Sequence, residues 1–233
     1  MHIFNPEHDL AMASDFDNFD APLSAKDFAR DLAYLPIWYA QAHDFVFVKE
    51  QDQAWMAGIC KQFPILSALS ISDRFNATDL PAPWGWDKTI RRTFEKNGIV
   101  NLPTTEDIEW VRRLSHREVS IEAMKHLASL SCGIPLAKPA ILLQDSEIER
   151  YIQAVPYAIF KAPWSGSGKG ICRSLGCLSE NLLNRVKNMA KKQGSVLAES
   201  LYHVVQNFAM EFLCENGTSS FVGYSWFSTS DNG

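Results

Sequence analysis

Apolar and polar positions form two kinds of block along the first hundred residues. Short apolar runs at 2–4, 45–48 and 65–71 are typical of buried strands, whereas residues 51–61 and 88–96 have the spacing of helices. Strands that alternate with helices predict a parallel sheet, with ligands favoured at the carboxyl ends of its strands.

The pattern changes after Thr104. Helical spacing and short strand-like runs then follow one another in the order 107–114, 146–154, 157–161, 179–193, 195–201, 207–214 and 219–227. Glu215-Asn-Gly-Thr218, between the last two runs, is a strong hairpin signal. The sequence therefore predicts an α/β chain whose second half is α+β, divided into domains at residues 1–103 and 104–233.

Ser115 and Glu118 have the spacing of a capping box, which predicts a helix that starts at Ser115 and ends at Cys132-Gly133. Arg117 would then lie in the first helical turn, where the helix dipole disfavours a cation. An anion bound between Arg117 and the free N–H groups would explain this arginine. A solvated arginine, tolerated at small cost, explains it equally well.

A glycine-rich segment follows the strand-like run 157–161 and its terminal residue Lys161. This glycine loop consists of Ser165, Gly166, Ser167, Gly168, Lys169 and Gly170. Closely spaced glycines let backbone N–H groups approach an anion, so the segment predicts a phosphate-binding loop; a flexible surface loop is the alternative. It is not a Walker A loop, because Pro163 stands at the first glycine position and Gly170 follows the lysine.

Composition narrows the class of protein. Of the 233 residues, 46% are hydrophobic and 21% charged, as in a globular protein. The net charge of −5 argues against nucleic acid as a partner, and no apolar run is long enough to span a membrane. Five cysteines, an odd number without a C-x-x-C pair, predict reduced thiols and a cytoplasmic location.

Taken in order, these residues resemble the ATP-grasp superfamily. Its first nucleotide motif is matched by Arg117 and Gly133-Ile-Pro135, and its second by Phe160-Lys161 with the glycine loop. Its third motif, an acidic strand end and hinge before a hairpin, is matched by Leu197-Ala-Glu199-Ser-Leu-Tyr202. The resemblance covers residues 104–233 and implies an ATP-grasp domain that follows a Rossmann-like domain.

The resemblance also implies roles for individual residues. Lys161 would contact the α- and β-phosphates of ATP, and Arg117 would replace a second phosphate-binding lysine. The glycine loop would close as a lid, with Lys169 near the β- and γ-phosphates. Glu199, Leu201 and Tyr202 would form the adenine hinge, although Glu199 also fits a surface carboxylate at a strand end.

The remaining site residues are less well defined. Asn5, Glu7 and Asp9 follow the first strand and are candidates for binding the acceptor substrate, but a polar turn that caps a helix would look the same. No catalytic residue is assigned. The magnesium ligands of the family lie late in its domain, so we expect the Mg²⁺ ligands beyond residue 233 and no ATP turnover by this chain. A piece of a longer protein is favoured over a natural truncation.

The implied activity of the whole protein is ATP-dependent ligation. A small-molecule carboxylate would be phosphorylated to an acyl phosphate and then captured by an amine or a thiol. A nucleotide-binding sensor or pseudo-enzyme is the alternative. An NAD(P)-binding first half is disfavoured, because Asn5-Pro6 stands where a glycine fingerprint would follow the first strand.

Overall fold

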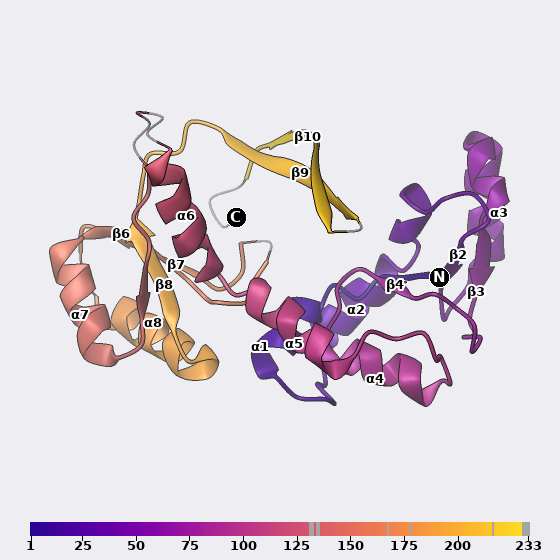
Figure 1. Cartoon of the computed structure of the whole chain (residues 1–233), viewed down its shortest axis with the longest axis horizontal. Coiled ribbons are helices and arrows are strands. Elements are labelled where there is room, and N and C mark those ends of the chain that lie inside the picture. Colours follow the sequence, from indigo (N-terminus) through magenta and orange to yellow (C-terminus); the bar gives the residue numbers. More distant parts are fainter. Residues whose placement is uncertain (131–132, 134–135, 167, 178, 216, 230–233) are drawn as a thin grey trace. The chain divides into compact units, whose positions relative to one another are not determined.

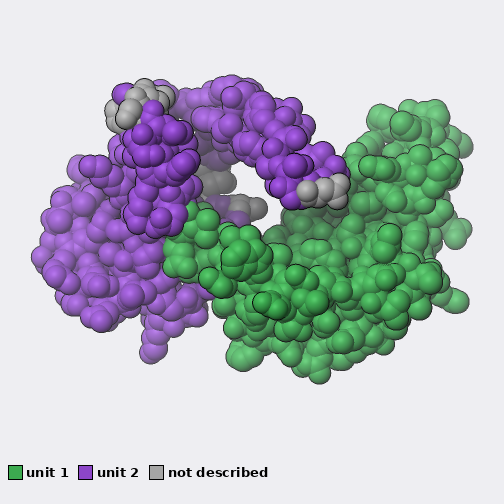
Figure 2. All heavy atoms as spheres, viewed as in Figure 1, with its two compact units in different colours: residues 1–119 green, residues 120–233 purple. Residues whose placement is uncertain are grey.

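A computed structural model describes residues 1–130, 133, 136–166, 168–177, 179–215 and 217–229. The chain divides into two compact units, Met1–Val119 and Ser120–Gly233 (Figure 2). Helix α5, Thr105–Leu114, belongs to the first unit, where Arg112 Nε donates to the carbonyl oxygen of Met12 at 2.8 Å. The predicted domain boundary between residues 103 and 104 stays a prediction.

The first unit contains a four-stranded sheet (Figure 1). Its strands are β1 His2–Ile3, β2 Phe45–Phe47, β3 Ser70–Ser72 and β4 Ala82–Pro83. Every described pairing is parallel, in the order β3-β2-β1-β4, which confirms the predicted parallel sheet. The chain runs outward from β1 to β3 on one side and then adds β4 on the other, so the strand order reverses between β1 and β4.

The helices of the first unit include the two predicted over 51–61 and 88–96, which are α3 Gln53–Gln62 and α4 Lys88–Lys96. The others are α1 His8–Ser14, α2 Leu23–Asp31 and α5, with 3-10 segments at Leu35–Trp38 and Pro64–Ala68. Asp87 caps α4 as its sequence indicates, accepting from the amides of Thr89 and Ile90. The strand expected over 65–71 is wrong in its first part, because Pro64 opens a 3-10 turn and has no N–H for a ladder.

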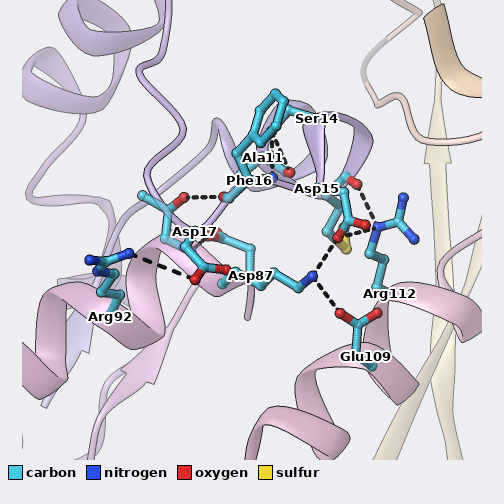
Figure 3. Close-up of polar contacts among 12 residues, drawn as sticks. Ala11, Ser14, Asp15, Phe16, Asp17, Asp87, Arg92, Glu109 and Arg112 are labelled. Atoms are coloured by element: carbon cyan, nitrogen blue, oxygen red, sulfur yellow. Dashed lines mark hydrogen bonds and ion pairs between the residues drawn. The ribbon is translucent and has the colours of Figure 1, made fainter.

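Asp15 joins three helices of the first unit (Figure 3). It ends α1 with a left-handed backbone, φ 58°, and its Oδ1 lies 2.7 Å from Lys88 Nζ on α4 and 3.3 Å from Arg112 Nε on α5. Lys88 also pairs with Glu109 Oε1 at 2.5 Å. These side chains hold the start of α4 beside the end of α1.

Helix α6, Val119–Ser129, begins four residues later than expected. The predicted capping box is wrong: Ser115 ends α5 with helical dihedrals, and its Oγ donates to the carbonyl oxygen of Val111 at 2.8 Å. An N-cap residue needs an extended backbone, which Ser115 lacks. Arg117 therefore lies in the turn before α6. Cys132, Ile134 and Pro135 of the predicted helix end lie outside the described residues.

The second unit contains an antiparallel sheet in the order β5-β8-β6-β7. Its strands are β5 Ala140–Leu142, β6 Tyr157–Lys161, β7 Ile171–Leu175 and β8 Val196–Ser200. Helices α7, Asp145–Ala154, and α8, Glu180–Gln193, pack on one face around the fully buried Phe160. The hairpin β9 Asn207–Glu215 and β10 Thr218–Phe227 forms a separate two-stranded sheet, as predicted. No helix in the described part of the chain is long and apolar enough to cross a membrane.

Candidate functional site

An ion pair lies on the sheet face opposite the core of the second unit. Lys161 at the end of β6 is the register partner of Leu197, and Glu199 is the partner of Ile159. Lys161 and Glu199 are therefore diagonal neighbours on one face, and Lys161 Nζ pairs with Glu199 Oε1. Their side chains are 25% and 17% exposed. The structure thus joins two residues that the sequence assigned to different motifs.

The glycine loop connects antiparallel strands β6 and β7, and its base is fixed. The amide of Ala162 donates to the carbonyl oxygen of Gly170 at 2.8 Å. Gln193, at the end of α8, accepts from the Trp164 amide at 2.9 Å and donates to the Trp164 carbonyl oxygen at 3.2 Å. Since Trp164 is also buried, the loop is anchored before its glycines begin.

Two of the loop glycines have backbone dihedrals that favour glycine. Gly168 and Gly170 have φ values of 73° and 68°, in the left-handed region. A Cβ at Gly170 would also lie 2.9 Å from Ala162 Cβ and 3.0 Å from Ser165 Cβ. The Ser165 hydroxyl donates to the carbonyl oxygen of Ala162 at 3.3 Å. Ser167 lies outside the described residues.

A cavity of about 610 Å³ lies beside the tip of the glycine loop. Its described lining contains the cations Lys169, Arg173 and Arg185 and no carboxylate. A neighbouring cavity of about 430 Å³ adds Lys192. Volumes of a few hundred Å³ are typical of ligand sites, and a lining of this charge suits an anion.

Sequence reasoning missed the two arginines of this cavity. Arg173 comes from β7, a strand that was not expected after the loop. Arg185 lies on α8 with Asn188, Met189 and Lys192, which also line the second cavity. The spacing i, i+3, i+4, i+7 places these residues on one helix face, and it is the sequence signal that could have found them.

The expected hinge follows β8. The Leu201 amide donates to the carbonyl oxygen of Tyr157 at 2.9 Å, which extends the contact of β8 with β6. Tyr202 is exposed. Tyr151 on α7 was not predicted for this region, but burial raises the pKa of its phenol, and the charges of Glu199 and Tyr202 raise that pKa further. The Tyr151 ring itself packs against Phe160 on the core side of the sheet, with ring centroids 6.0 Å apart.

The acceptor candidates lie in the first unit. Asn5 is buried and makes two hydrogen bonds with Gly85, from Nδ2 to the carbonyl oxygen at 2.7 Å and to Oδ1 from the amide at 3.1 Å. Glu7 lines a cavity with Asn5, whereas Asp9 lies 3.5 Å from His8 Nε2 and is not among the residues that line it. Arg117 also belongs to the first unit.

Metal-ligating side chains do not gather into a cluster in the described part of the chain. No group of three or more His, Cys, Asp or Glu side chains that could hold a metal ion occurs among the described residues. Glu199 is paired with Lys161, and Glu211 lies on the exposed strand β9.

A scan against protein-family models finds no match, and a search of curated proteins finds none either. Solved structures do match. An N5-carboxyaminoimidazole synthetase from Staphylococcus aureus, solved with ADP, is 14% identical, with 82% of this chain and 56% of that chain covered and a TM-score of 0.45. The ADP complex of purK, an N5-carboxyaminoimidazole ribonucleotide synthetase, is 12% identical, with 99% and 54% covered and a TM-score of 0.48.

This chain thus spans little more than half the length of those two proteins. A RimK domain protein ATP-grasp from Sphaerobacter thermophilus is 12% identical, with 78% of this chain and 71% of that chain covered and a TM-score of 0.42. At such identities the likeness concerns the fold alone. A solved ATP-grasp protein is accordingly among the structures to which this chain is similar.

Proposed function

We propose that the second unit binds ATP beside the glycine loop. The observation that carries this proposal is the cavity lined by Lys169, Arg173 and Arg185 without a carboxylate. Three cations around one cavity attract a polyphosphate more strongly than a monoanion, because each charged contact adds to the same ligand.

Strand β6 and the glycine loop would each contribute a different kind of contact to the phosphates: a lysine side chain and backbone amides. Lys161 lines neither described cavity; it precedes the fixed loop base on the sheet face opposite the core, and its charge is balanced by Glu199 until a phosphate shares it. The amides around Gly168 and Gly170 can approach phosphate oxygens closely, since these residues have no Cβ. The exposed Tyr202 and the carboxylate of Glu199 would contact the adenosine part.

The parent activity that fits this site is ATP-dependent ligation of a carboxylate to an amine or a thiol. ATP would transfer its γ-phosphoryl group to the carboxylate, and the nucleophile would displace phosphate from the acyl phosphate. The residues named here would position the triphosphate and stabilise its charge. The resemblance of residues 104–233 to the ATP-grasp motifs supports this reaction class.

Isothermal titration calorimetry with ATP tests the binding site. Arg185→Ala should weaken ATP binding by about tenfold, since a charge-assisted hydrogen bond contributes ~1.5–3 kcal/mol. Lys191→Ala is the matched control, because Lys191 lies on the same helix and lines neither described cavity. Equal losses in the two variants would mean that ATP responds to overall charge and not to this cavity.

A nucleotide sensor or pseudo-enzyme is separated from a ligase by turnover. Release of ADP from ATP in the presence of Mg²⁺, dependent on added carboxylate and amine, supports the ligase. Unchanged ATP alongside saturable binding supports the sensor.

A further inference from the structure

A further cavity, of about 150 Å³, lies in the first unit. Its polar lining includes Asn5, Glu7, Asp20, Lys26, Asp87 and Thr89. Asn5 and Glu7 follow β1, and Asp87 follows β4. The cavity thus lies beyond the carboxyl ends of the two strands between which the strand order reverses. Open parallel sheets bind ligands at this position, because the chain diverges there and leaves a crevice.

One carboxylate oxygen of the residues that line this cavity has no hydrogen-bond partner among the described residues. Glu7 Oε2 is buried and accepts no hydrogen bond from the described part of the chain. Burial raises the pKa of Glu7, and the nearby charge of Asp87 raises it further. A buried acceptor without a donor costs stability, so it marks a place where a ligand could supply the donor.

The other polar groups of the cavity already have partners. Asn5 is bonded to Gly85, and Lys26 Nζ pairs with Asp20 Oδ1 at 2.6 Å. The Thr89 hydroxyl donates to the carbonyl oxygen of Phe16 at 3.2 Å and accepts from the Phe19 amide at 3.0 Å. The carboxylates of Glu7 and Asp87 therefore leave an excess of acceptors, with His8 as the nearby group whose charge acts on both of them.

Asp87 leaves one oxygen available to a ligand. Its Oδ1 accepts from the amides of Thr89 and Ile90 at 2.8 and 2.9 Å. Within the described part of the chain, Oδ2 receives only a long contact of 3.4 Å from Asn5 Nδ2. Burial also raises the pKa of Asp87. Two incompletely bonded carboxylates on one cavity favour a cation that carries several N–H donors.

We infer that this cavity binds the primary ammonium group of a small amine. A divalent metal fits less well, because the described residues contain no group of three or more suitable metal ligands. An ammonium ion offers three N–H donors in a small volume, enough for Glu7 Oε2 and Asp87 Oδ2 together. The inference concerns the first unit alone and does not rest on nucleotide binding.

The test is an NMR titration of the ¹⁵N-labelled chain without nucleotide. Ethylammonium chloride is compared with tetramethylammonium chloride at equal ionic strength and pH 7.5. Ethylammonium should shift the amides of Glu7, Thr89 and Ile90 in a saturable manner. Tetramethylammonium should leave them unchanged, because it has the charge but no N–H donor. Equal responses to the two cations would overturn the inference.

Two variants complete the experiment. Glu7→Gln should weaken ethylammonium binding tenfold or more, with the fold checked by circular dichroism. Glu95→Gln should bind as the parent does, because Glu95 is an exposed residue of α4 that pairs with Arg91 and does not line the cavity. If Glu7→Gln binds ethylammonium as tightly as Glu95→Gln, the ammonium site is wrong. If Glu7→Gln does not fold, the comparison of ethylammonium with tetramethylammonium on the parent chain still tests the ammonium site.

Discussion

Lys161 Nζ and Glu199 Oε1 form an ion pair across strands β6 and β8, although they are 38 residues apart in the chain. The pair faces away from the core that surrounds Phe160. Because each charge neutralises the other, the strand end presents no net charge until an anion competes for Lys161. The competition between Glu199 and phosphate for Lys161 can be measured by replacing Lys161 and, separately, by replacing Glu199.

Replacing Lys161 tests the phosphate contact. Lys161→Ala should weaken ATP binding about tenfold or more, since a charge-assisted contact contributes ~1.5–3 kcal/mol. Calorimetry on this variant and on Lys191→Ala, at one ionic strength, measures the effect. Unchanged affinity in Lys161→Ala would remove Lys161 from the site.

Replacing Glu199 should have the opposite effect on a ligand that has phosphates but no adenosine. Glu199→Gln should tighten binding of inorganic tripolyphosphate about threefold or more, because roughly 0.7 kcal/mol of repulsion and competition disappears. ATP itself should gain less, since the carboxylate contact to adenosine is also lost. Weaker tripolyphosphate binding in Glu199→Gln would contradict the competition.

Gly170 should not tolerate a side chain. Gly170→Ala adds an unfavourable φ of 68° to contacts of 2.9–3.1 Å with Ala162 and Ser165, so a stability loss of ~1–3 kcal/mol and weaker ATP binding are expected. Gly194→Ala is the control, because Gly194 has φ 83° but nothing within 4 Å of an added Cβ. Urea unfolding and calorimetry of both variants separate crowding from backbone strain. Equal losses of stability and of ATP affinity in the two variants would show that the glycine loop shifts to make room for the added Cβ.

The helices and strands that the sequence predicted correctly are determined by interactions between residues close in the chain. Asp87 begins α4, and Ser179 and Gly194 bound α8, through caps that need no distant residue. Short strand-like runs placed β6 and β8 within one residue of their observed ends. The ion pair Lys161–Glu199 could not be predicted in the same way, because it depends on the register of strands joined by a long connection.

The predictions that were wrong or incomplete also have structural explanations. Ser115 and Glu118 satisfied a spacing rule, but the preceding helix continues to Leu114 and takes Ser115 as its own end. The arginines of the cavity were missed because β7 was not recognised after the loop. The sequence proposed Glu7 as an acceptor candidate, which stays a prediction. Asp87 lines the same cavity but was not proposed, because it lies 80 residues further along the chain, after β4.

The pH dependence of stability tests the effect of burying the Glu7 carboxylate. Burial raises its folded-state pKa above the ordinary value of 4.5, so the folded chain binds this proton more tightly than the unfolded chain. Stability from this group is therefore greatest at low pH and falls as the pH rises through the raised pKa. Glu7→Gln removes the ionisation while keeping the shape of the side chain. It should be more stable than the parent at pH 7, and the difference should shrink towards pH 4.5.

Urea unfolding of both proteins at pH 4.5, 5.5, 6.5 and 7.5 measures this difference, with Glu95→Gln as the exposed control. A Glu7→Gln variant that is less stable than the parent by the same amount at every pH would show that Glu7 makes a stabilising contact. Ethylammonium should narrow the gap at pH 7.5, because a ligand that binds only the folded parent stabilises it by mass action. A carboxylate kept at a cost in stability, and relieved of that cost by an amine, is a binding group and not a packing residue.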